Sequence, residues 1–496
     1  MRRLKILLIL LAVLIAASIT VVIISRHEQK KEEIKNSDAI ILEIPKESVT
    51  ALSFEYEETK LSFSRGSEGT FLWDEDAAFP ADQEKIDNLL SVFESFGVSF
   101  VIENVEDFAQ YGLTDPEAKI RISTASGTTD VLLGAFSTID EKRYVSIGDG
   151  KVYLVNHDPM DDYKLQISDL IKHDVIPKTG LSGSEKIRFS GAENYEISLE
   201  RDSGKSANPD DLYFADTLPL STNFVTTFLS DVRSLSLSDY VSYNATAEEL
   251  AAYGLDNPDL TITLDYPVTD EEDNTTMETL VLHLGQNQED LAEAQKALEE
   301  AEQNAKEPSE DSEEGEEEND PMSQVRCYAR VGDSQIIYEI SNTSYQTLTA
   351  VSLNELRQWE VLGARFQDIT GLTVTVDGAT YSLTTETTPA EDEDSDPVRT
   401  WYYDGEKIES TDALSAALTA LSASNAESFT DAQPDGKEEI TLTVSLDNEN
   451  FPTIDAELYR ADGKTCLAVK NGESLCYVPR STVVDLIEAV NEIVLK

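Results

Sequence analysis

The cysteines and the many acidic side chains are the residues best able to do chemistry in this 496-residue sequence. Any pair among its 96 Asp and Glu residues could in principle supply the acid and the base of a hydrolase. Cys466 and Cys476 flank a turn at Asn471-Gly472. A three-residue loop would place the two thiols opposite each other, within reach of a disulfide. A two-residue turn would shift the register by one, and both would pack as free, small apolar residues.

Familiar catalytic and metal-binding motifs are absent from the sequence. It contains no Gly-x-x-x-x-Gly-Lys-Ser/Thr, Gly-x-Gly-x-x-Gly, His-Glu-x-x-His or Gly-x-Ser-x-Gly. Asp392, Asp394 and Asp396 alternate as in a calcium loop, but Pro397 stands where that loop needs glycine. Three Cys and four His offer few ligands for zinc or an iron–sulfur cluster. We therefore predict no catalytic, cofactor-binding or metal-binding residue, and no enzyme activity.

A short aromatic motif occurs twice, in the same order relative to its neighbours. Tyr111-Gly112-Leu113-Thr114-Asp115-Pro116 is echoed by Tyr253-Gly254-Leu255-Asp256-Asn257-Pro258, and Trp73 recurs as Trp401. Such rings could form a ligand platform, but a residue that every copy requires is usually a packing residue. We interpret the following residues as structural: Trp73, Tyr111, Gly112, Leu113, Pro116, Tyr253, Gly254, Leu255, Pro258 and Trp401.

The elements that must position these residues also recur. Apolar residues at helical spacing follow Asp82, Ser221 and Ser410, each of which we expect to be a helix N-cap. The glycine of each Tyr-Gly-Leu motif is expected to end a helix. Hairpin signals with Gly, Asn or Asp at the turn follow in all three segments.

These repeats predict an α+β fold. It consists of an N-terminal transmembrane helix followed by about three repeated units of antiparallel strands with one amphipathic helix each. The expected parts are a cytoplasmic tail (1–5), a transmembrane helix (6–25), a juxtamembrane linker (26–47), repeat unit 1 (48–165), a linker (166–184), repeat unit 2 (185–350) with an acidic insertion (286–320), a linker (351–365) and a degenerate repeat unit 3 (366–496).

The N-terminal segment predicts where the protein lies in the cell. Ile6–Ile24 is a run of 19 residues with only two polar members, long enough to cross a bilayer. Arg2, Arg3 and Lys5 precede it, which favours a cytoplasmic N-terminus. The sequence thus predicts a single-pass cell-membrane protein with an extracytoplasmic C-terminal ectodomain. The alternative is a cleaved signal peptide with its small-residue site at Ala16-Ala17-Ser18.

The charge balance excludes one class of partner. The formal net charge is −58, whereas nucleic-acid binding needs clusters of Lys and Arg. Hydrophobic residues make up 40% of the chain, enough for ordinary cores. We therefore expect folded domains that bind no nucleic acid.

The repeated Tyr-Gly-Leu-x-x-Pro segments, each preceded by a hairpin and a helix, resemble the bacterial family called domain of unknown function 4340. The resemblance is good over roughly 48–350 and weak over 366–496. It implies an N-terminal membrane anchor, proximity to an auxiliary ABC-transport system of the gliding-motility type, and no known catalytic residues.

The expected function is therefore a noncatalytic, membrane-anchored extracytoplasmic repeat protein of the bacterial cell envelope. It would bind a transporter or envelope protein as an accessory subunit. The alternatives are an envelope hydrolase that uses a carboxylate pair, and a structural stalk.

Overall fold

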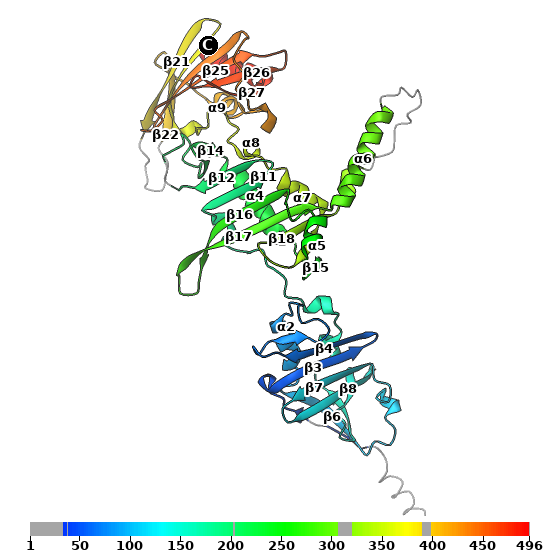
Figure 1. Cartoon of the computed structure of the whole chain (residues 1–496). Helices are drawn as coiled ribbons and strands as arrows, with labels where there is room; N and C mark the ends of the chain where they lie inside the picture. Colours follow the sequence, from blue (N-terminus) through cyan, green and yellow to red (C-terminus); the bar gives the residue numbers. More distant parts are fainter. Residues whose placement is uncertain (1–32, 37, 202–203, 306–319, 389–397, 496) are drawn as a thin grey trace, which may run out of the picture. The chain divides into compact units, whose positions relative to one another are not determined.

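The computed structural model describes residues 33–36, 38–201, 204–305, 320–388 and 398–495. The chain divides into two compact units, Met1–His173 and Asp174–Lys496. The described part of the first unit is built on a ten-stranded sheet, and that of the second unit on a nine-stranded and an eight-stranded sheet (Figure 1). Every strand pair in them is antiparallel.

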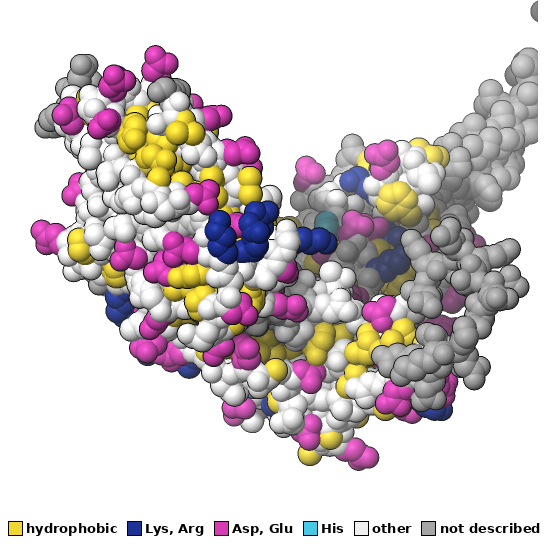
Figure 2. All heavy atoms as spheres, turned by 90° about the horizontal axis from the view of Figure 1, so that it is seen from above, with side chains coloured by type: hydrophobic (Ala, Val, Ile, Leu, Met, Phe, Trp, Pro, Cys, Tyr) yellow, Lys and Arg dark blue, Asp and Glu magenta, His cyan; other side chains and the backbone are white. Residues whose placement is uncertain are grey.

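The surface is dominated by carboxylates. Figure 2 shows acidic side chains spread over the viewed face, whereas Lys and Arg side chains gather in a few small groups. This distribution follows from the composition, since the chain has 96 acidic and 38 basic residues.

The first sheet has the order β1-β6-β10-β9-β8-β7-β3-β4-β5, and β2 also pairs with β6. Tyr163 contacts both this sheet and the helix that contains Leu89. Its ring packs edge-on against Phe54 of β3 at 5.1 Å, and its hydroxyl donates to the Leu89 carbonyl at 2.7 Å. The strands are β1 (Glu33–Asn36), β2 (Ile40–Leu42), β3 (Val49–Tyr56), β4 (Thr59–Arg65), β5 (Phe71–Trp73), β6 (Phe96–Glu103), β7 (Ala118–Thr124), β8 (Gly127–Ser137), β9 (Lys142–Ser146) and β10 (Val152–Val155).

The second sheet has the order β14-β13-β12-β11-β16-β17-β18-β19-β15. Phe189 of β11 contacts Phe228 of helix α4, with ring centroids 5.2 Å apart. The strands are β11 (Lys186–Gly191), β12 (Asn194–Leu199), β13 (Tyr213–Ala215), β14 (Leu218–Leu220), β15 (Tyr240–Ser242), β16 (Leu260–Thr269), β17 (Thr275–Gln286), β18 (Cys327–Val331) and β19 (Ile337–Ile340).

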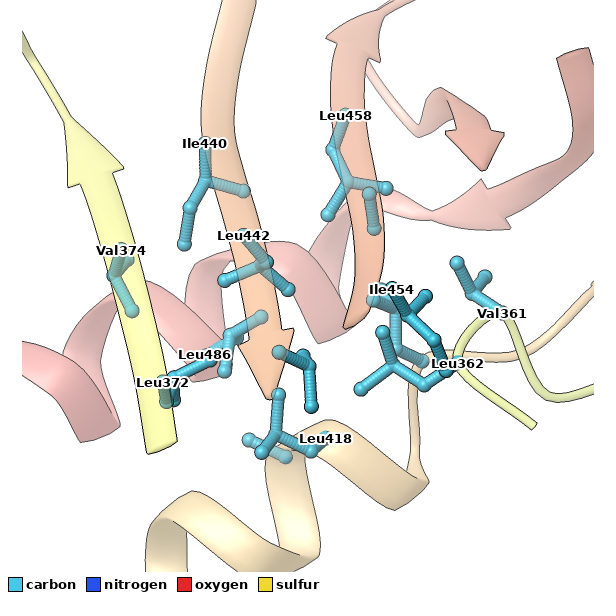
Figure 3. Close-up of a cluster of buried hydrophobic side chains, with 14 of the residues drawn as sticks. Val361, Leu362, Leu372, Val374, Leu418, Ile440, Leu442, Ile454, Leu458 and Leu486 are labelled. Carbon is cyan, nitrogen blue, oxygen red and sulfur yellow. The ribbon is translucent and has the colours of Figure 1, made fainter. Parts of the chain in front are cut away.

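The third sheet has the order β23-β22-β21-β20-β24-β25-β26-β27. Figure 3 shows part of its core, where Leu418 and Leu486 from two helices meet Leu442 of β24. The strands are β20 (Ile369–Val376), β21 (Ala379–Thr388), β22 (Val398–Tyr403), β23 (Glu406–Lys407), β24 (Glu438–Leu446), β25 (Thr453–Arg460), β26 (Thr465–Lys470) and β27 (Glu473–Pro479).

The three sheets share a strand order. In each, an early strand (β3, β11 or β20) pairs on one side with the next strand of its own hairpin. On its other side it pairs with the first strand of a later four-stranded meander, β7–β10, β16–β19 or β24–β27. Between the hairpin and the meander of each sheet, the chain forms a helix: α2 (Gln83–Ser91), α4 (Thr222–Ser234) or α9 (Asp412–Thr419).

The helices correct the predicted fold. The described residues are mainly antiparallel sheet, and the prediction of an α+β chain with one helix per unit is wrong, because the second sheet has several helices and the third has two. The helices are α2 (Gln83–Ser91), α3 (Met160–Tyr163), α4 (Thr222–Ser234), α5 (Ala247–Ala252), α6 (Gln288–Ala305), α7 (Asn342–Thr349), α8 (Leu353–Leu356), α9 (Asp412–Thr419) and α10 (Arg480–Val494).

Helix α5 and the predicted transmembrane helix are two further points of comparison with the predicted fold. Helix α5 has no buried residue and begins at a capping box on Thr246, so a search for apolar periodicity does not detect it.

No helix in the described part of the chain is long and apolar enough to cross a bilayer. The predicted transmembrane segment, residues 6–25, lies outside the described residues.

The predicted helix N-caps are correct in the first two segments and wrong in the third. Asp82 and Ser221 are N-caps whose side chains accept backbone N–H groups of the first turn, as predicted. The third prediction is wrong by one residue, since Thr411 is the N-cap of α9 and its side chain makes no capping hydrogen bond. Ser410 Oγ accepts instead from the Asp412 N–H at 3.2 Å.

Cys466 and Cys476 are free and buried. Of the two alternatives for this pair, the disulfide is therefore wrong. Asn471 and Gly472 both have positive φ and form a two-residue turn between Lys470 and Glu473. A register shift between Ala468 and Val469 then places Cys466 opposite Val478.

Candidate functional site

The Tyr-Gly-Leu motifs are packing elements. Gly112 is the left-handed C-cap of a 3-10 helix with φ 69°, and Gly254 has φ 68° just after the end of α5. Each motif packs on a glycine of a neighbouring strand, Gly134 of β8 or Gly285 of β17. A Cβ atom on Gly134 would lie 2.2 Å from the Tyr111 carbonyl oxygen, and one on Gly285 would lie 2.5 Å from that of Gly254.

The other predicted structural residues pack locally too. Trp73 contacts Phe79 edge-on at 5.4 Å, and Trp401 stacks on Phe366 at 5.2 Å. Tyr111 and Tyr253 pack against other tyrosine rings, at 4.9 Å and 4.4 Å. Leu113 and Leu255 are buried, whereas Pro116 and Pro258 are half-buried. Trp73 and the first motif belong to the first unit, and the second motif and Trp401 belong to the second.

A cavity of about 410 Å³ lies elsewhere, within the second unit. Its walls come from the β12–β14 region, from the segment that follows α8, and from β25–β27 with their turns. The lining residues are Lys205, Ser206, Ala207, Asp211, Thr217, Leu218, Pro219, Arg357, Gln358, Glu360, Gly363, Phe451, Ile454, Lys470, Asn471, Glu473, Ser474 and Leu475. This volume and this mixture of apolar and charged groups are typical of small-molecule sites.

The segment 357–363 is fixed at both ends, which gives the cavity a firm wall. Arg357 forms an isolated bridge with Leu220, next to β14 and α4. Val361 and Leu362 are buried in the core of the third sheet (Figure 3). Between these anchors, Arg357, Gln358 and Glu360 line the cavity, while Val361 is held in the core.

Asp211 is a buried carboxylate on one wall. Its side chain accepts from Ser206 Oγ at 2.6 Å and from Gln358 Nε2 at 3.1 Å. Burial raises the pKa of Asp211 above its usual value, and these hydrogen bonds only partly oppose the shift. The two bonds hold the carboxylate in place and join two walls of the cavity.

Lys470 and Glu360 are half-buried near Asp211. The Lys470 ammonium donates to the Leu362 carbonyl at 2.9 Å. Burial lowers the pKa of Lys470, and the charges of Asp211 and Glu360 oppose that shift. Burial also raises the pKa of Glu360, with a further rise from Asp211. Ionisable groups with shifted pKa values in a cavity are typical of functional sites.

Arg357 is the arginine that lines the cavity. Its guanidinium carbon lies 4.1 Å from the centroid of the Phe429 ring. Burial is the main cause that lowers the pKa of Arg357. With Lys205 and Glu473 included, the cavity offers a planar cation, two ammonium groups, three carboxyls and an apolar surface, which suits the binding of a small charged molecule. In the described residues no group of three His, Cys, Asp or Glu side chains could hold a metal ion.

Sequence reasoning missed all six charged residues of this cavity, which include Lys205 and Glu473. They come from three separate regions of the chain, and no motif links them. The only local signal was at Lys470, a lysine that ends an apolar strand just before the Asn471-Gly472 turn.

Comparison with known proteins gave one match. A family model described as "Domain of unknown function (DUF4340)" matches residues 73–258, a segment that contains both Tyr-Gly-Leu motifs and Asp211. No curated protein and no solved structure matches the chain. The match supports, over residues 73–258, the resemblance of this chain to the DUF4340 family.

Proposed function

We propose that this chain is a noncatalytic binding protein, and that the cavity of the second unit is its ligand site. The observation that carries the proposal is the cavity itself, with charged side chains from separate segments converging on about 410 Å³. The proposal also assigns an extracytoplasmic role as an accessory subunit of an ABC-type transport or envelope system. That part rests on the family resemblance, and its partner would be a transporter or envelope protein.

The arrangement of Asp211 supports binding. Its two carboxylate oxygens already accept hydrogen bonds from Ser206 and Gln358, so it joins the walls of the site. A residue held this way preorganises a cavity, which raises affinity by reducing the ordering needed on binding.

The test uses the full chain and a small-molecule extract of cells that produce it. After equilibration and desalting, mass spectrometry of the denatured protein identifies retained compounds. Thr217 is exposed and lines the cavity, so Thr217→Trp should fill it and abolish retention. Thr380→Trp, at an exposed hairpin position outside the cavity, is the matched control and should retain the ligand. Equal retention by wild type and Thr217→Trp, or none by either, would reject the proposal.

A hydrolase remains the second candidate because of one observation. Asp211 and Glu360 line the same cavity, and burial raises the pKa of both, as a general acid requires. In the same extract, a hydrolase would convert one compound into two fragments over time, and Glu360→Gln would stop the conversion. A binding protein would leave the composition of the extract constant.

A further inference from the structure

Arg357 is a half-buried cation with no carboxylate partner. Among the described residues, no ion pair involves it; its Nη1 donates to Asn354 Oδ1 at 3.4 Å, and its guanidinium carbon lies over the Phe429 ring. Arg365, eight residues further on, is different, because its Nε lies 2.7 Å from Asp368 Oδ2. Arg357 thus lines a cavity that also contains carboxyl groups, yet it forms no ion pair with any described one of them.

An anion would complete this arrangement. Burying a cation is unfavourable unless an opposite charge or hydrogen-bond acceptors replace the water it loses. The planar guanidinium presents parallel N–H donors that fit the two oxygens of a carboxylate. The contact between its guanidinium carbon and the Phe429 ring, at 4.1 Å from the centroid, helps to hold the group in place.

Lys470 provides a second donor group in the same cavity. An ammonium has three N–H donors, and the bond to the Leu362 carbonyl uses one of them. Asp211 and Glu360 lie near enough to influence the pKa of Lys470. Three basic side chains (Lys205, Arg357 and Lys470) and three acidic ones line the cavity, so their formal charges balance, which favours a ligand with a single negative charge over a dianion.

The rest of the wall is apolar. Leu218, Pro219, Phe451, Ile454 and Leu475 line the cavity together with the charged groups. Contact with these side chains would remove hydrocarbon surface of a ligand from water, at roughly 25 cal/mol per Å². The ligand is therefore expected to be amphipathic.

We propose that the cavity binds a small organic monocarboxylate, with its carboxylate on Arg357 and Lys470 and its hydrocarbon part along the apolar wall. The inference deepens the proposed binding function and rests on it.

The experiment is isothermal titration calorimetry of the full chain with acetate, butyrate, hexanoate and benzoate. Hexanamide and hexylamine serve as neutral and cationic probes of the same length as hexanoate. We expect saturable binding that strengthens from acetate to hexanoate, and hexanamide to bind at least about tenfold more weakly. Hexylamine should not bind in the cavity.

Variants then locate the carboxylate. Arg357→Met should weaken hexanoate binding by about tenfold or more, and Arg357→Lys, which keeps the charge but loses the planar fork, by less. Arg365→Met is the matched control and should bind as wild type, since Arg365 does not line the cavity. Circular dichroism and thermal melting would show that the variants fold.

The outcomes separate this inference from the proposed function. No binding of any carboxylate, or equal binding of hexanoate and hexanamide, would overturn the carboxylate assignment. So would wild-type affinity in both Arg357 variants. The proposed function would still stand in these cases if Thr217→Trp abolished the retention of a neutral or cationic compound from the extract. It would fail, and this inference with it, if no retained compound depended on the cavity.

Discussion

At the residue scale, the cavity depends on how a few charged groups are buried. Asp211 is 5% exposed, and its environment favours the protonated form although two donors contact it. Desolvation is the larger effect, because a carboxylate taken out of water loses more than two neutral hydrogen bonds return. Asp211 therefore opposes folding at neutral pH more than it does in acid.

Asp211→Asn tests this balance. A group with a raised folded-state pKa contributes stability that is fully present below its unfolded value, near 3.8, and is lost as pH rises through the folded value. Asparagine does not titrate. The free energy of unfolding of the variant relative to wild type should therefore rise as pH increases from about 4 to about 7. Urea unfolding across this range is the measurement.

Asp216→Asn is the control for that series, because Asp216 is exposed in the turn after β13. Its unfolding curves should follow those of wild type at every pH. If the Asp211→Asn and wild-type stabilities ran parallel across the range, the desolvation account would be wrong.

At the element scale, the Tyr-Gly-Leu motif and a glycine of the neighbouring strand form one packing unit. The left-handed Gly112 ends a helical turn, and the motif then lies against β8 so closely that only glycine fits at 134. The same contact recurs between Gly254 and Gly285. This close packing explains why a glycine stands at both 134 and 285, and the reason is structural rather than chemical.

Gly134→Ala should therefore destabilise the first unit by about 1–3 kcal/mol, the range for overpacking. Gly97→Ala is the control in the same unit, since the atom nearest its added Cβ is the flexible end of Asn156 at 3.1 Å. It should change stability by no more than about 0.5 kcal/mol.

The measurement can be restricted to the first unit. The chain has three tryptophans, of which Trp73 lies in the first unit and Trp359 and Trp401 in the second. In a Trp359→Phe, Trp401→Phe background, urea unfolding followed by fluorescence reports on Trp73. An unchanged midpoint for Gly134→Ala would show that β8 can move away from the motif.

At the scale of the whole molecule, self-repulsion opposes folding. The net charge is −58, and the described surface carries carboxylates on most of the face in Figure 2. Compact states hold like charges closer together than unfolded chains do, so the repulsion destabilises the folded protein. Screening by salt should relieve part of it.

Raising sodium chloride from about 10 mM to about 150 mM shortens the screening length from about 30 Å to about 8 Å. The melting temperature should rise over this interval, as calorimetry would show. Potassium chloride should produce the same rise, because screening depends on ionic strength. A fall in melting temperature would mean that attractive ion pairs outweigh the net repulsion.

Local features of this fold were predictable from the sequence alone. The N-caps Asp82 and Ser221 and the Asn471-Gly472 hairpin agree with the structure. These features depend on neighbouring residues along the chain, through capping hydrogen bonds and turn geometry. Helix α5 has no buried residue, so apolar periodicity gave no signal for it, whereas the expected helix end at Gly254 did.

By itself, the sequence determined the charge, the turns, the caps and the repeated motifs of this protein. Only the tertiary structure decided the order of strands in the sheets, the pairing of Cys466 with Val478, and the meeting of Asp211, Arg357 and Lys470 in one cavity. A bulge of one residue moved the cysteine register, and the cavity joins residues from separate regions of the chain. Long-range packing sets such contacts, and no local spacing encodes them.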